Sequence, residues 1–366
     1  MKIRTRDEGR KHHRELVMNK QAISWLDVID YQMRIGSARV RMGGIGSVNT
    51  KPEYRMKGYA KRLLKDSIDY MVKEGYDVSG LFGIPDLYHK FGYSLCMPDY
   101  KLSMTTKNAE ESKKKGKAEQ YKIKKFKKTD LKSIIDLYNE QSQNRTCSLV
   151  RYRKYFTRFI RGTNWEADTD NLMIRNSKGL LAYAILDKSD HHVNVVEVMS
   201  KSDRDFPALL YEFAKMAIER RCSQINLYMP SDHPFAQYIQ RYGCHLTVEY
   251  PKSGGGMLRI INQNSLFEKI QPELEKRMQK ANMQGVSLRI ETDLGETRLC
   301  LGRPSRKGLK HFLVLPQQSL IQLVVGHRNI RDILNDNGVR ASKDIEPIAD
   351  ILFPGALPYM WLADHF

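Results

Sequence analysis

The sequence predicts an α/β protein built from more than one domain. Its 366 residues correspond to two or three domains of roughly 150 residues each. Strand-like and helix-like patterns alternate along the chain, and their order over residues 24–104 is similar to that over 121–261. This similarity indicates an internal structural duplication. Because 41% of the residues are hydrophobic and 28% are charged, the composition is that of a globular protein.

The first predicted unit covers residues 1–104. Residues 24–60 alternate between apolar and polar side chains and contain a Gly-Ser turn, which indicates two antiparallel strands. From Gly58 onward the apolar residues recur at helical spacing, and Gly75 ends the predicted helix. The expected elements that follow are a short strand over VSGLFGI, a short helix around Tyr88 and a strand over 93–104.

Two further units follow a lysine-rich linker over residues 105–120. In the second unit, residues 121–261, we expect a strand, a capped helix, three strands, the helix FPALLYEFAKMAIERR, the strand QINLYMP, the helix PFAQYIQRYG and a final pair of strands around SGGG. In the third unit, residues 262–366, we expect the helix SLFEKIQPELEKRMQK, three strands and further helices. The chain ends in FPGALPYMWLADHF, and this aromatic ending predicts a docked carboxyl terminus.

The composition argues against several classes of protein. No run of apolar residues is long enough to cross a membrane, and the amino terminus lacks the apolar core of a secretory signal. The five cysteines are scattered and odd in number, which is typical of reduced thiols in the cytoplasm. The adjacent histidine pairs, His12–His13 and His191–His192, would point to different sides of a strand or helix, so no metal site is expected.

The formal net charge of +19 favours an anionic partner. Ten of the lysines lie between Lys107 and Lys128, where aromatic residues are rare. Nucleic-acid binding would favour arginines with interleaved aromatic residues, so a solvated linker is the better interpretation of this run. The remaining charge suits a polyanionic ligand such as a phosphorylated cofactor.

The strongest local signal is the segment VNTKPEYRMKGYA, residues 48–60, between a predicted strand and a predicted helix. The first backbone N–H groups of a helix have no partner within it, and together with the helix dipole they favour a bound phosphate. Gly58 and Ala60 would let phosphates approach the backbone. Positive charge comes from Arg55, Lys57 and Lys61. The segment is neither GxGxxG nor GxxxxGK[ST], which argues against a dinucleotide or a nucleoside triphosphate. The alternative interpretation is an ordinary helix start with basic surface residues.

This segment resembles the acetyl-CoA-binding motif, R/Q-x-x-G-x-G/A, of the GNAT-fold N-acetyltransferases. The segment LFGIPDLYHKFGY, residues 81–93, is similar to the following strand and to the Tyr-x-x-Phe-Gly-Tyr motif of the enhanced-intracellular-survival family within that group. The ending LFPGALPYMWLADHF resembles that family's terminus, and the three motifs occur in the same order. The resemblance implies a GNAT domain (1–104), a second GNAT-like domain and a sterol-carrier-like domain. It implies an acyltransferase that transfers an acetyl group from acetyl-CoA to a primary amine of an aminoglycoside, a polyamine or a lysine-like acceptor.

The resemblance also implies roles for residues of this sequence. Tyr88 corresponds to the general acid, and the α-carboxylate of Phe366 corresponds to the general base. Gly83 and Ile84 are expected to line the thioester. The residues expected to contact the pantetheine arm and the pyrophosphate are Val48, Asn49, Thr50, Arg55, Met56, Lys57, Gly58, Tyr59, Ala60 and Lys61. These roles fit the reaction, because a protonated amine must lose a proton before it attacks a thioester and the departing thiolate must gain one. By residue type alone, Tyr88 would be a packing aromatic residue and Phe366 a hydrophobic plug.

Two departures from the family pattern affect the expected site. The family opens with a strand, two helices and a strand, but only about 24 residues precede the first long strand here, enough for a strand over MKIRTR and one short helix. The acceptor pocket of this shortened domain is therefore expected to be open, to be completed by another subunit, or to be no longer catalytic. In the second domain, Asp203 and Asp205 stand where phosphates would bind, so no cofactor is expected there.

The protein is thus expected to be a cytoplasmic homo-oligomer, a hexamer or a trimer by resemblance, whose partner is a small-molecule amine and not a membrane or a metal. The alternative is a non-catalytic acyl-CoA- or lipid-binding protein. Nucleic-acid binding is a third reading that only the charge supports.

Overall fold

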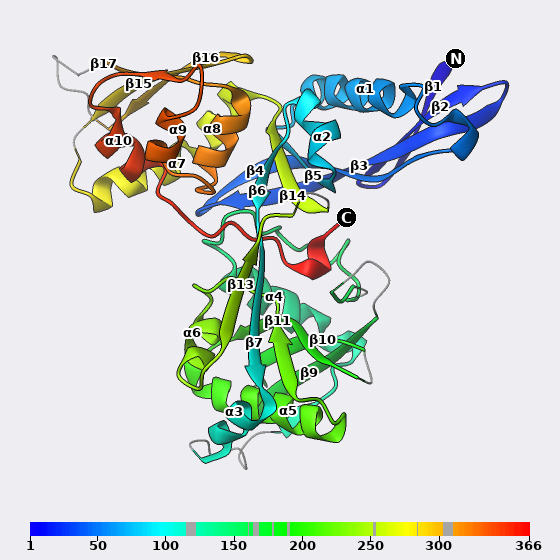
Figure 1. Cartoon of the computed structure of the whole chain (residues 1–366), viewed down its shortest axis with the longest axis vertical. Coiled ribbons are helices and arrows are strands. Elements are labelled where there is room, and N and C mark those ends of the chain that lie inside the picture. The colour runs from blue at the N-terminus through cyan, green and yellow to red at the C-terminus, as the bar shows by residue number, and fades with distance from the viewer. Residues whose placement is uncertain are drawn as a thin grey trace.

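Three β-sheets organise the chain. The computed structural model describes residues 1–114, 122–159, 161–163, 168–177, 179–188, 191–251, 254–283, 285–302 and 310–366. Figure 1 shows three lobes: an amino-terminal lobe at the upper right, a central lobe below it and a carboxy-terminal lobe at the upper left. Within the described residues, the strand orders of their sheets are β1-β2-β3-β4-β5-β14-β6, β13-β7-β12-β11-β10-β9-β8 and β16-β15-β17-β18, respectively.

The sheet of the amino-terminal lobe carries helix α1 on one face, as Figure 1 shows. The elements of this lobe are β1 (Lys2–Glu8), β2 (Lys11–Met18), β3 (Gln21–Ile35), β4 (Ala38–Thr50), α1 (Tyr59–Lys73), β5 (Val78–Gly83), α2 (Pro85–Tyr88), β6 (Ser94–Met97) and β14 (Gly255–Ile260). Leu63, Leu64 and Met71 recur at helical spacing and bury one face of α1 against the sheet. Strands β4 and β5, which α1 connects, are parallel, and their neighbours are antiparallel.

The first eighteen residues contain the expected strand over MKIRTR, but a second strand takes the place of the expected short helix. They form the antiparallel hairpin β1–β2, which extends the sheet beyond β3. Complementary side chains face each other across the hairpin: Arg4 pairs with Glu15, and His12 Nδ1 lies 2.8 Å from an Asp7 carboxylate oxygen. Cross-strand pairs of this kind stabilise a two-stranded ribbon. They form only once the two strands are opposed, so helical periodicity could not reveal them.

Two strands cross between the sheets. The strand β7 (Asp99–Thr105), most of which falls in the predicted first unit, lies between β12 and β13 of the central sheet. The strand β14, expected in the second unit, lies between β5 and β6 of the amino-terminal sheet. The predicted pairing of the two strands around SGGG is therefore wrong, because β13 (His245–Glu249) bonds β7 instead. Other backbone hydrogen bonds join the two lobes directly, such as that from the Arg34 amide to the Ser148 carbonyl at 2.9 Å.

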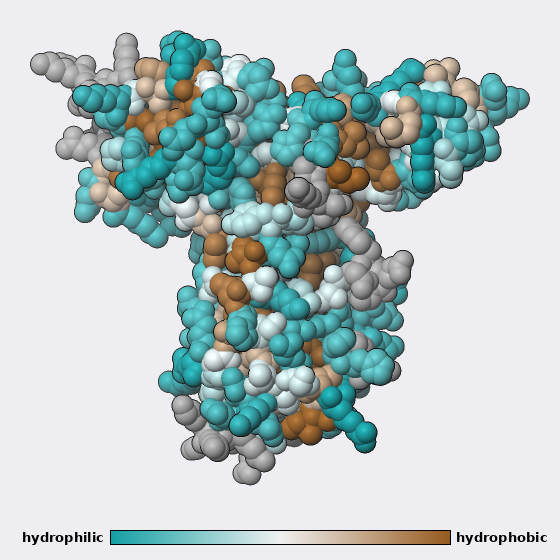
Figure 2. Space-filling view, viewed as in Figure 1, coloured by the Kyte–Doolittle hydropathy of each residue, from teal (hydrophilic) through white to brown (hydrophobic). Residues whose placement is uncertain are grey.

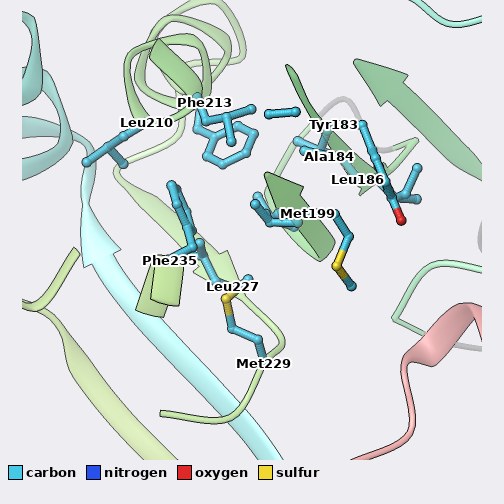
Figure 3. Close-up of a cluster of buried hydrophobic side chains, with 14 of the residues drawn as sticks. Tyr183, Ala184, Leu186, Met199, Leu210, Phe213, Leu227, Met229 and Phe235 are labelled. Carbon is cyan, nitrogen blue, oxygen red and sulfur yellow. The ribbon is translucent and has the colours of Figure 1, made fainter. Parts of the chain in front are cut away.

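The central lobe packs helices around its seven-stranded sheet. Its other elements are α3 (Thr106–Glu110), β8 (Lys122–Lys124), α4 (Leu131–Gln141), β9 (Thr169–Asn176), β10 (Gly179–Asp187), β11 (Val193–Ser200), α5 (Phe206–Glu219), β12 (Gln224–Leu227) and α6 (Pro234–Gln240). Figure 3 shows its core, where Leu210 and Phe213 of α5 lie near Phe235 of α6. The first residues of the expected lysine-rich linker form α3, which packs on α5. Residues 115–121 lie outside the described residues.

The carboxy-terminal lobe packs against the amino-terminal lobe. Its elements are α7 (Gln263–Lys280), β15 (Val286–Thr292), β16 (Gly295–Leu301), β17 (Lys310–Val314), α8 (Gln317–Val324), α9 (Ile330–Leu334), β18 (Arg340–Ala341) and α10 (Ile345–Leu352). Lys269 of α7 forms an ion pair with the buried Asp77 at 2.6 Å, and Glu273 accepts a hydrogen bond from the Ser37 amide at 3.1 Å. After α10 the chain returns to the other lobes and ends in a short 3₁₀ turn, Leu362–Asp364, and two further residues.

The surface is mainly polar. Figure 2 shows that hydrophilic residues predominate on the visible face and that hydrophobic residues gather in small separate patches. Among the described residues, every helix is too short or too polar to cross a membrane. The five cysteines are unpaired.

Candidate active site

Strands β4 and β5 separate at the centre of the amino-terminal sheet. They pair in parallel only as far as Ile45 and Leu81. The rest of β4 remains bonded to β3, and the rest of β5 remains bonded to β14. A shift in the β3–β4 register and the positive φ of Ser47, 54°, mark a bulge where the strands part. The opening leaves backbone N–H and C=O groups of both strands available to a ligand.

The carboxyl terminus lies against this opening. A Cβ atom on Gly44 of β4 would be 2.7 Å from Cε2 of Phe366, and a Cβ atom on Gly46 would be 3.3 Å from the carboxyl carbon of Phe366. The ring of Tyr31 on β3 flanks the Phe366 ring at a centroid distance of 5.0 Å. Phe366 is only 9% exposed, so the predicted docking of the terminus is confirmed. The two glycines are the reason that a bulky aromatic residue can lie directly on β4.

His365 attaches the terminus to β5. Its ring stacks on that of Phe82 at 3.8 Å, and its Nε2 lies 3.3 Å from the carbonyl oxygen of Met360. Burial lowers the pKa of His365 to about 3, so the imidazole is neutral at pH 7. His365 therefore serves as an aromatic contact and does not carry charge into the site.

A buried ion network holds the segment that leads to the terminus. Arg151, 3% exposed, donates to both oxygens of Glu197 on β11 at 2.8 and 2.6 Å and to both oxygens of Asp364 at 2.8 and 3.0 Å. The hydroxyl of Tyr138 donates to Asp364 at 2.8 Å, and that of Tyr183 donates to Glu197 at 2.5 Å. Because every charge in the network has a partner, the central lobe holds the chain rigidly two residues before its end.

A cavity of about 530 Å³ opens beside the terminus. Its walls come from the β1–β2 hairpin, β3, the bulge of β4, residues 149–158 and Arg161 of the central lobe, and the final residues. The basic side chains in its lining are Arg10, Lys11, Arg151, Arg158 and Arg161, and the acidic side chains are Asp27 and Asp364. Lys11 Nζ lies 2.9 Å and His13 Nδ1 lies 2.7 Å from Asp27. Burial opposes ionisation of Asp27, but these hydrogen bonds outweigh burial and lower its pKa.

A second, smaller cavity of about 300 Å³ lies on the other side of His365. Its lining includes Asp99 and Glu249, with Lys101 as a basic neighbour. Burial and, second, the charge of Glu249 raise the pKa of Asp99. The two cavities beside the terminus therefore differ in charge: the larger is basic and the smaller is acidic.

Tyr88 and Phe366 lie on opposite faces of the sheet at the same end of the opening. The Tyr88 ring covers Gly83 so closely that a Cβ atom there would be 2.3 Å from Cε2 of Tyr88. Successive residues of a strand face opposite sides, so Gly83 faces Tyr88 while its neighbour Phe82 faces the terminus, 5.6 Å from the Phe366 ring. Within the described residues, the Tyr88 hydroxyl has no hydrogen-bond partner, and burial raises its pKa. A protonated hydroxyl without a structural bond is free to donate to a ligand.

The predicted phosphate-binding turn joins β4 to α1 on the surface. Gly58 is the N-cap of α1 with a φ of 78°, and no side chain caps the helix. A Cβ atom on Gly58 would have no neighbour within 4 Å, so the positive φ is what favours glycine here. Arg55 Nε donates to the carbonyl of Thr50 and Lys57 Nζ to that of Glu53, both at 3.0 Å. These bonds fold both cations back onto the turn that leads into α1, whose first amides have no side-chain cap.

The other predicted contact residues lie along the same edge of the lobe. Val48, Asn49 and Thr50 end β4, Met56 is a fully exposed residue of the turn, and Tyr59, Ala60 and Lys61 form the first turn of α1. Gly83 ends β5 across the opening and Ile84, which follows it, is exposed. In the part of the chain that the structure describes, no three His, Cys, Asp or Glu side chains are grouped as metal ligands would be.

Residues 6–96, the segment that contains the opening, the turn and Tyr88, match the sequence profile of the acetyltransferase (GNAT) domain. The fold is that of GNAT acetyltransferases. A GCN5-related N-acetyltransferase from Anabaena variabilis is similar with a TM-score of 0.75 and 17% identity, over 97% of this chain and 89% of that chain. One from Kribbella flavida has a TM-score of 0.73 and 17% identity, over 97% and 88%. Eis1 from Mycobacterium abscessus has a TM-score of 0.67 and 14% identity, over 98% and 91%. A comparison with curated proteins finds no match.

The predicted α/β GNAT fold is thus confirmed. The match of residues 6–96 to the acetyltransferase (GNAT) domain supports an acyltransferase. The GNAT fold implies the use of an acyl-CoA. The sequence reasoning did not identify Arg10, Tyr31, Arg151 or Asp364 as residues of the site. Only Asp364 had a local signal, because it is the one acidic residue of the ending LFPGALPYMWLADHF.

Proposed function

We propose that the protein is an N-acetyltransferase that transfers an acetyl group from acetyl-CoA to the primary amine of a small molecule. The observation that carries this proposal is the β4–β5 opening, which has the terminal carboxylate of Phe366 on one face and the hydroxyl of Tyr88 on the other. A base and an acid on the two sides of one opening suit a reaction that removes a proton from one reactant and returns one to the other.

The residues around the opening suit acetyl-CoA. The uncapped amides of the 15-residue helix α1 and the nearby Arg55 and Lys57 would hold the pyrophosphate. The end of β4 from Val48 to Thr50 offers backbone groups to the amides of the pantetheine arm, and Gly83 with Ile84 would line the thioester. When bound, acetyl-CoA supplies an activated acetyl group.

The protein's own groups would then move two protons. The Phe366 carboxylate takes a proton from the amine, directly or through water, because an ammonium group cannot attack. The amine nitrogen forms the new C–N bond as the C–S bond breaks. Tyr88 donates its proton to the departing thiolate, and burial helps by keeping its hydroxyl protonated. Backbone N–H groups at the opening polarise the carbonyl.

We further propose that the central lobe is a second GNAT-like domain that binds no cofactor and that the carboxy-terminal lobe is sterol-carrier-like. In support of the duplication, α5 connects β11 to the parallel β12 as α1 connects β4 to β5. The two helix starts differ in charge, however, because Asp203 and Asp205 precede α5. These carboxylates would repel the phosphates that the basic turn before α1 would attract.

The proposal is tested by thiol release from acetyl-CoA with a panel of primary amines, together with acetyl-CoA binding measured by calorimetry. Gly58→Glu places a carboxylate beside the expected phosphates and should abolish binding. Gly58→Asn is the matched control, because Asn tolerates a positive φ without adding charge. Binding without turnover would favour the alternative of a non-catalytic acyl-CoA-binding protein. Equal binding by both variants and the unaltered protein would exclude this turn as the phosphate site.

A further inference from the structure

We infer that the larger cavity binds an acceptor that carries an anionic group, a carboxylate or a phosphate, in addition to its amine, and that Arg10 holds this group. The inference deepens the proposed function and rests on it for the identity of the acceptor. The charges of the cavity are a separate argument, independent of the proposed function, that the ligand carries an anionic group.

Arg10 is built as an oxyanion receptor. It occupies the turn of the β1–β2 hairpin, where its carbonyl accepts a hydrogen bond from the Asp30 amide at 2.8 Å. Its Cζ atom lies 4.6 Å from the ring centroid of Tyr31 and 5.0 Å from that of Tyr155. A guanidinium that stacks on aromatic rings is held in position while its N–H edge remains available for a bidentate bond to a carboxylate or phosphate.

Every nearby side-chain carboxylate already has a basic partner. Asp7 bonds His12, and Glu8 pairs with Arg6 in the same hairpin. On β3, Asp27 binds Lys11 and His13, and Asp30 pairs with Arg41 at 3.0 Å. Within the described residues no carboxylate lies in ion-pair distance of the Arg10 guanidinium. Among the described residues, Arg10 is therefore an unpaired cation in a cavity whose side-chain carboxylates all have basic partners, and such a cation favours an anionic ligand. The α-carboxylate of Phe366 also lies in the lining, but it is not within ion-pair distance of Arg10.

The receptor lies near the proposed base. The Tyr31 ring contacts both the Arg10 guanidinium and the Phe366 ring, the latter at a centroid distance of 5.0 Å. One tyrosine ring therefore separates the expected anionic group from the expected amine. This spacing suits a small acceptor such as an amino acid or a phosphorylated amino alcohol, whereas a polycationic amine would meet Arg10 and Arg158 without compensation.

The test compares acceptors that differ only in the anionic group: lysine with cadaverine, and O-phosphoethanolamine with ethanolamine. We expect kcat/KM to be at least about tenfold higher for the anionic member of one pair, and the pair with the larger preference identifies carboxylate or phosphate. Arg10→Gln should lower kcat/KM for that member by about ten- to a hundredfold, the loss expected for a charge-assisted bond. The ratio of kcat/KM between the anionic member and its partner in the pair should fall accordingly. Arg241→Gln is the matched control, because Arg241 also stacks on a tyrosine, Tyr238 at 4.7 Å, but lies in the central lobe.

Binding of the same four compounds, measured by calorimetry in the presence of CoA, separates the two proposals. If turnover is faster with the diamine, or if Arg10→Gln does not alter turnover, the inference is wrong while the proposed acetyltransferase activity stands. If Asp99→Asn abolishes that diamine preference, the amine belongs in the acidic cavity instead. Absence of turnover with Arg10-dependent binding of the anionic compounds would support the site and overturn the proposed function. If neither turnover nor Arg10-dependent binding is observed, both the inference and the proposed function are wrong.

Discussion

The carboxyl carbon of Phe366 lies 3.3 Å from the position that a Cβ atom would occupy on Gly46. The end of the chain is therefore in contact with the backbone of β4 just where β4 leaves β5. Any side chain at this glycine would press on the terminal group, and any extension of the chain would move it.

The first prediction concerns the chain end. A short tag after Phe366 converts the proposed base into a neutral amide and should lower kcat by about 10²-fold or more, since misplacement of a catalytic group has effects of this size. Deletion of Phe366 leaves a carboxylate displaced by about 3.3–3.8 Å and should do the same. Phe366→Leu keeps the carboxylate in place and should retain much of the activity. Thermal melts confirm that each variant is folded. A tagged protein with full activity, together with a damaged Phe366→Leu, would show that Phe366 is only a plug.

The second prediction concerns the glycine beneath the ring of Phe366. A Cβ atom on Gly44 would lie 2.7 Å from the Phe366 ring and 2.8 Å from the Tyr31 ring. Both neighbours are side chains, so the fold should persist while the terminus shifts, and Gly44→Ala should lower kcat about tenfold or more. Gly355→Ala is the control, because a Cβ atom there has no neighbour within 4 Å. Equal rates for both variants would contradict this position of the terminus.

The third prediction concerns Asp364. Asp364→Asn removes one carboxylate from the buried Arg151, which bonds to two. Breaking a buried ion pair on one side costs about 3–5 kcal/mol, so urea denaturation should show a loss of this size in the free energy of unfolding. The kcat should also fall, with the KM for acetyl-CoA unchanged, since the damage is to the position of the terminus. Asp350→Asn, at an exposed site on α10, should alter neither quantity. An unchanged free energy of unfolding in Asp364→Asn would mean that the network does not hold the tail.

The fourth prediction concerns Tyr88. Tyr88→Phe should lower kcat by about 10²-fold, the usual contribution of a general acid, without weakening acetyl-CoA binding. Because the pKa of Tyr88 is raised, its deprotonation should reduce kcat only above about pH 10, and the variant should lack this alkaline limb. Tyr93→Phe is the control: its hydroxyl bonds Ser79 at 2.7 Å, so it should lower stability by about 1 kcal/mol and keep the limb. Full activity in Tyr88→Phe would remove this residue from the mechanism.

The fifth prediction concerns stability in acid. Burial, with the charge of Arg145 second, lowers the pKa of His233 to about 3 from an ordinary value of 6.5. Between these values the unfolded chain binds more protons than the folded chain, so the free energy of unfolding falls as the pH drops below about 6.5. His233→Asn should reduce this slope by up to about 1.4 kcal/mol per pH unit. Asn can still accept the bond that His233 Nδ1 accepts from the Phe235 amide. Urea denaturation at a series of pH values measures the slope.

A control variant and the residual pH dependence from two other histidines complete this experiment. His245→Asn changes an exposed histidine and should leave the slope as it is. His327 and His365, whose pKa values burial lowers to about 4 and about 3, should maintain a residual slope in His233→Asn. A variant whose acid sensitivity matches the unaltered protein would show that His233 is not buried in neutral form.

The sequence by itself predicted those elements whose signals are local. The two long strands, the helix α1 with its apolar stripe and the turn at Gly58 each depend on residues within about four positions of one another, and the structure contains all three. The fold class followed from the order of these elements, and the docked terminus followed from the aromatic residues at the end of the chain. The spacing of apolar residues along a segment reflects which of its faces is buried in the folded lobe, and for this reason these predictions agree with the structure.

The tertiary structure alone decided what lies between distant parts of the chain. Asp364 meets Arg151 across 213 positions, and β14 enters a sheet whose other strands end by Met97. The first strand of the hairpin that carries Arg10 was expected, but the second strand, β2, formed where a short helix was expected, because its cross-strand side-chain pairs exist only after the two strands meet. The charge of the cavity likewise depends on which carboxylates find basic partners in space. Contacts of this kind leave no periodic trace in a single sequence, since each residue contributes one member of a pair whose partner is set by the packing of the lobes.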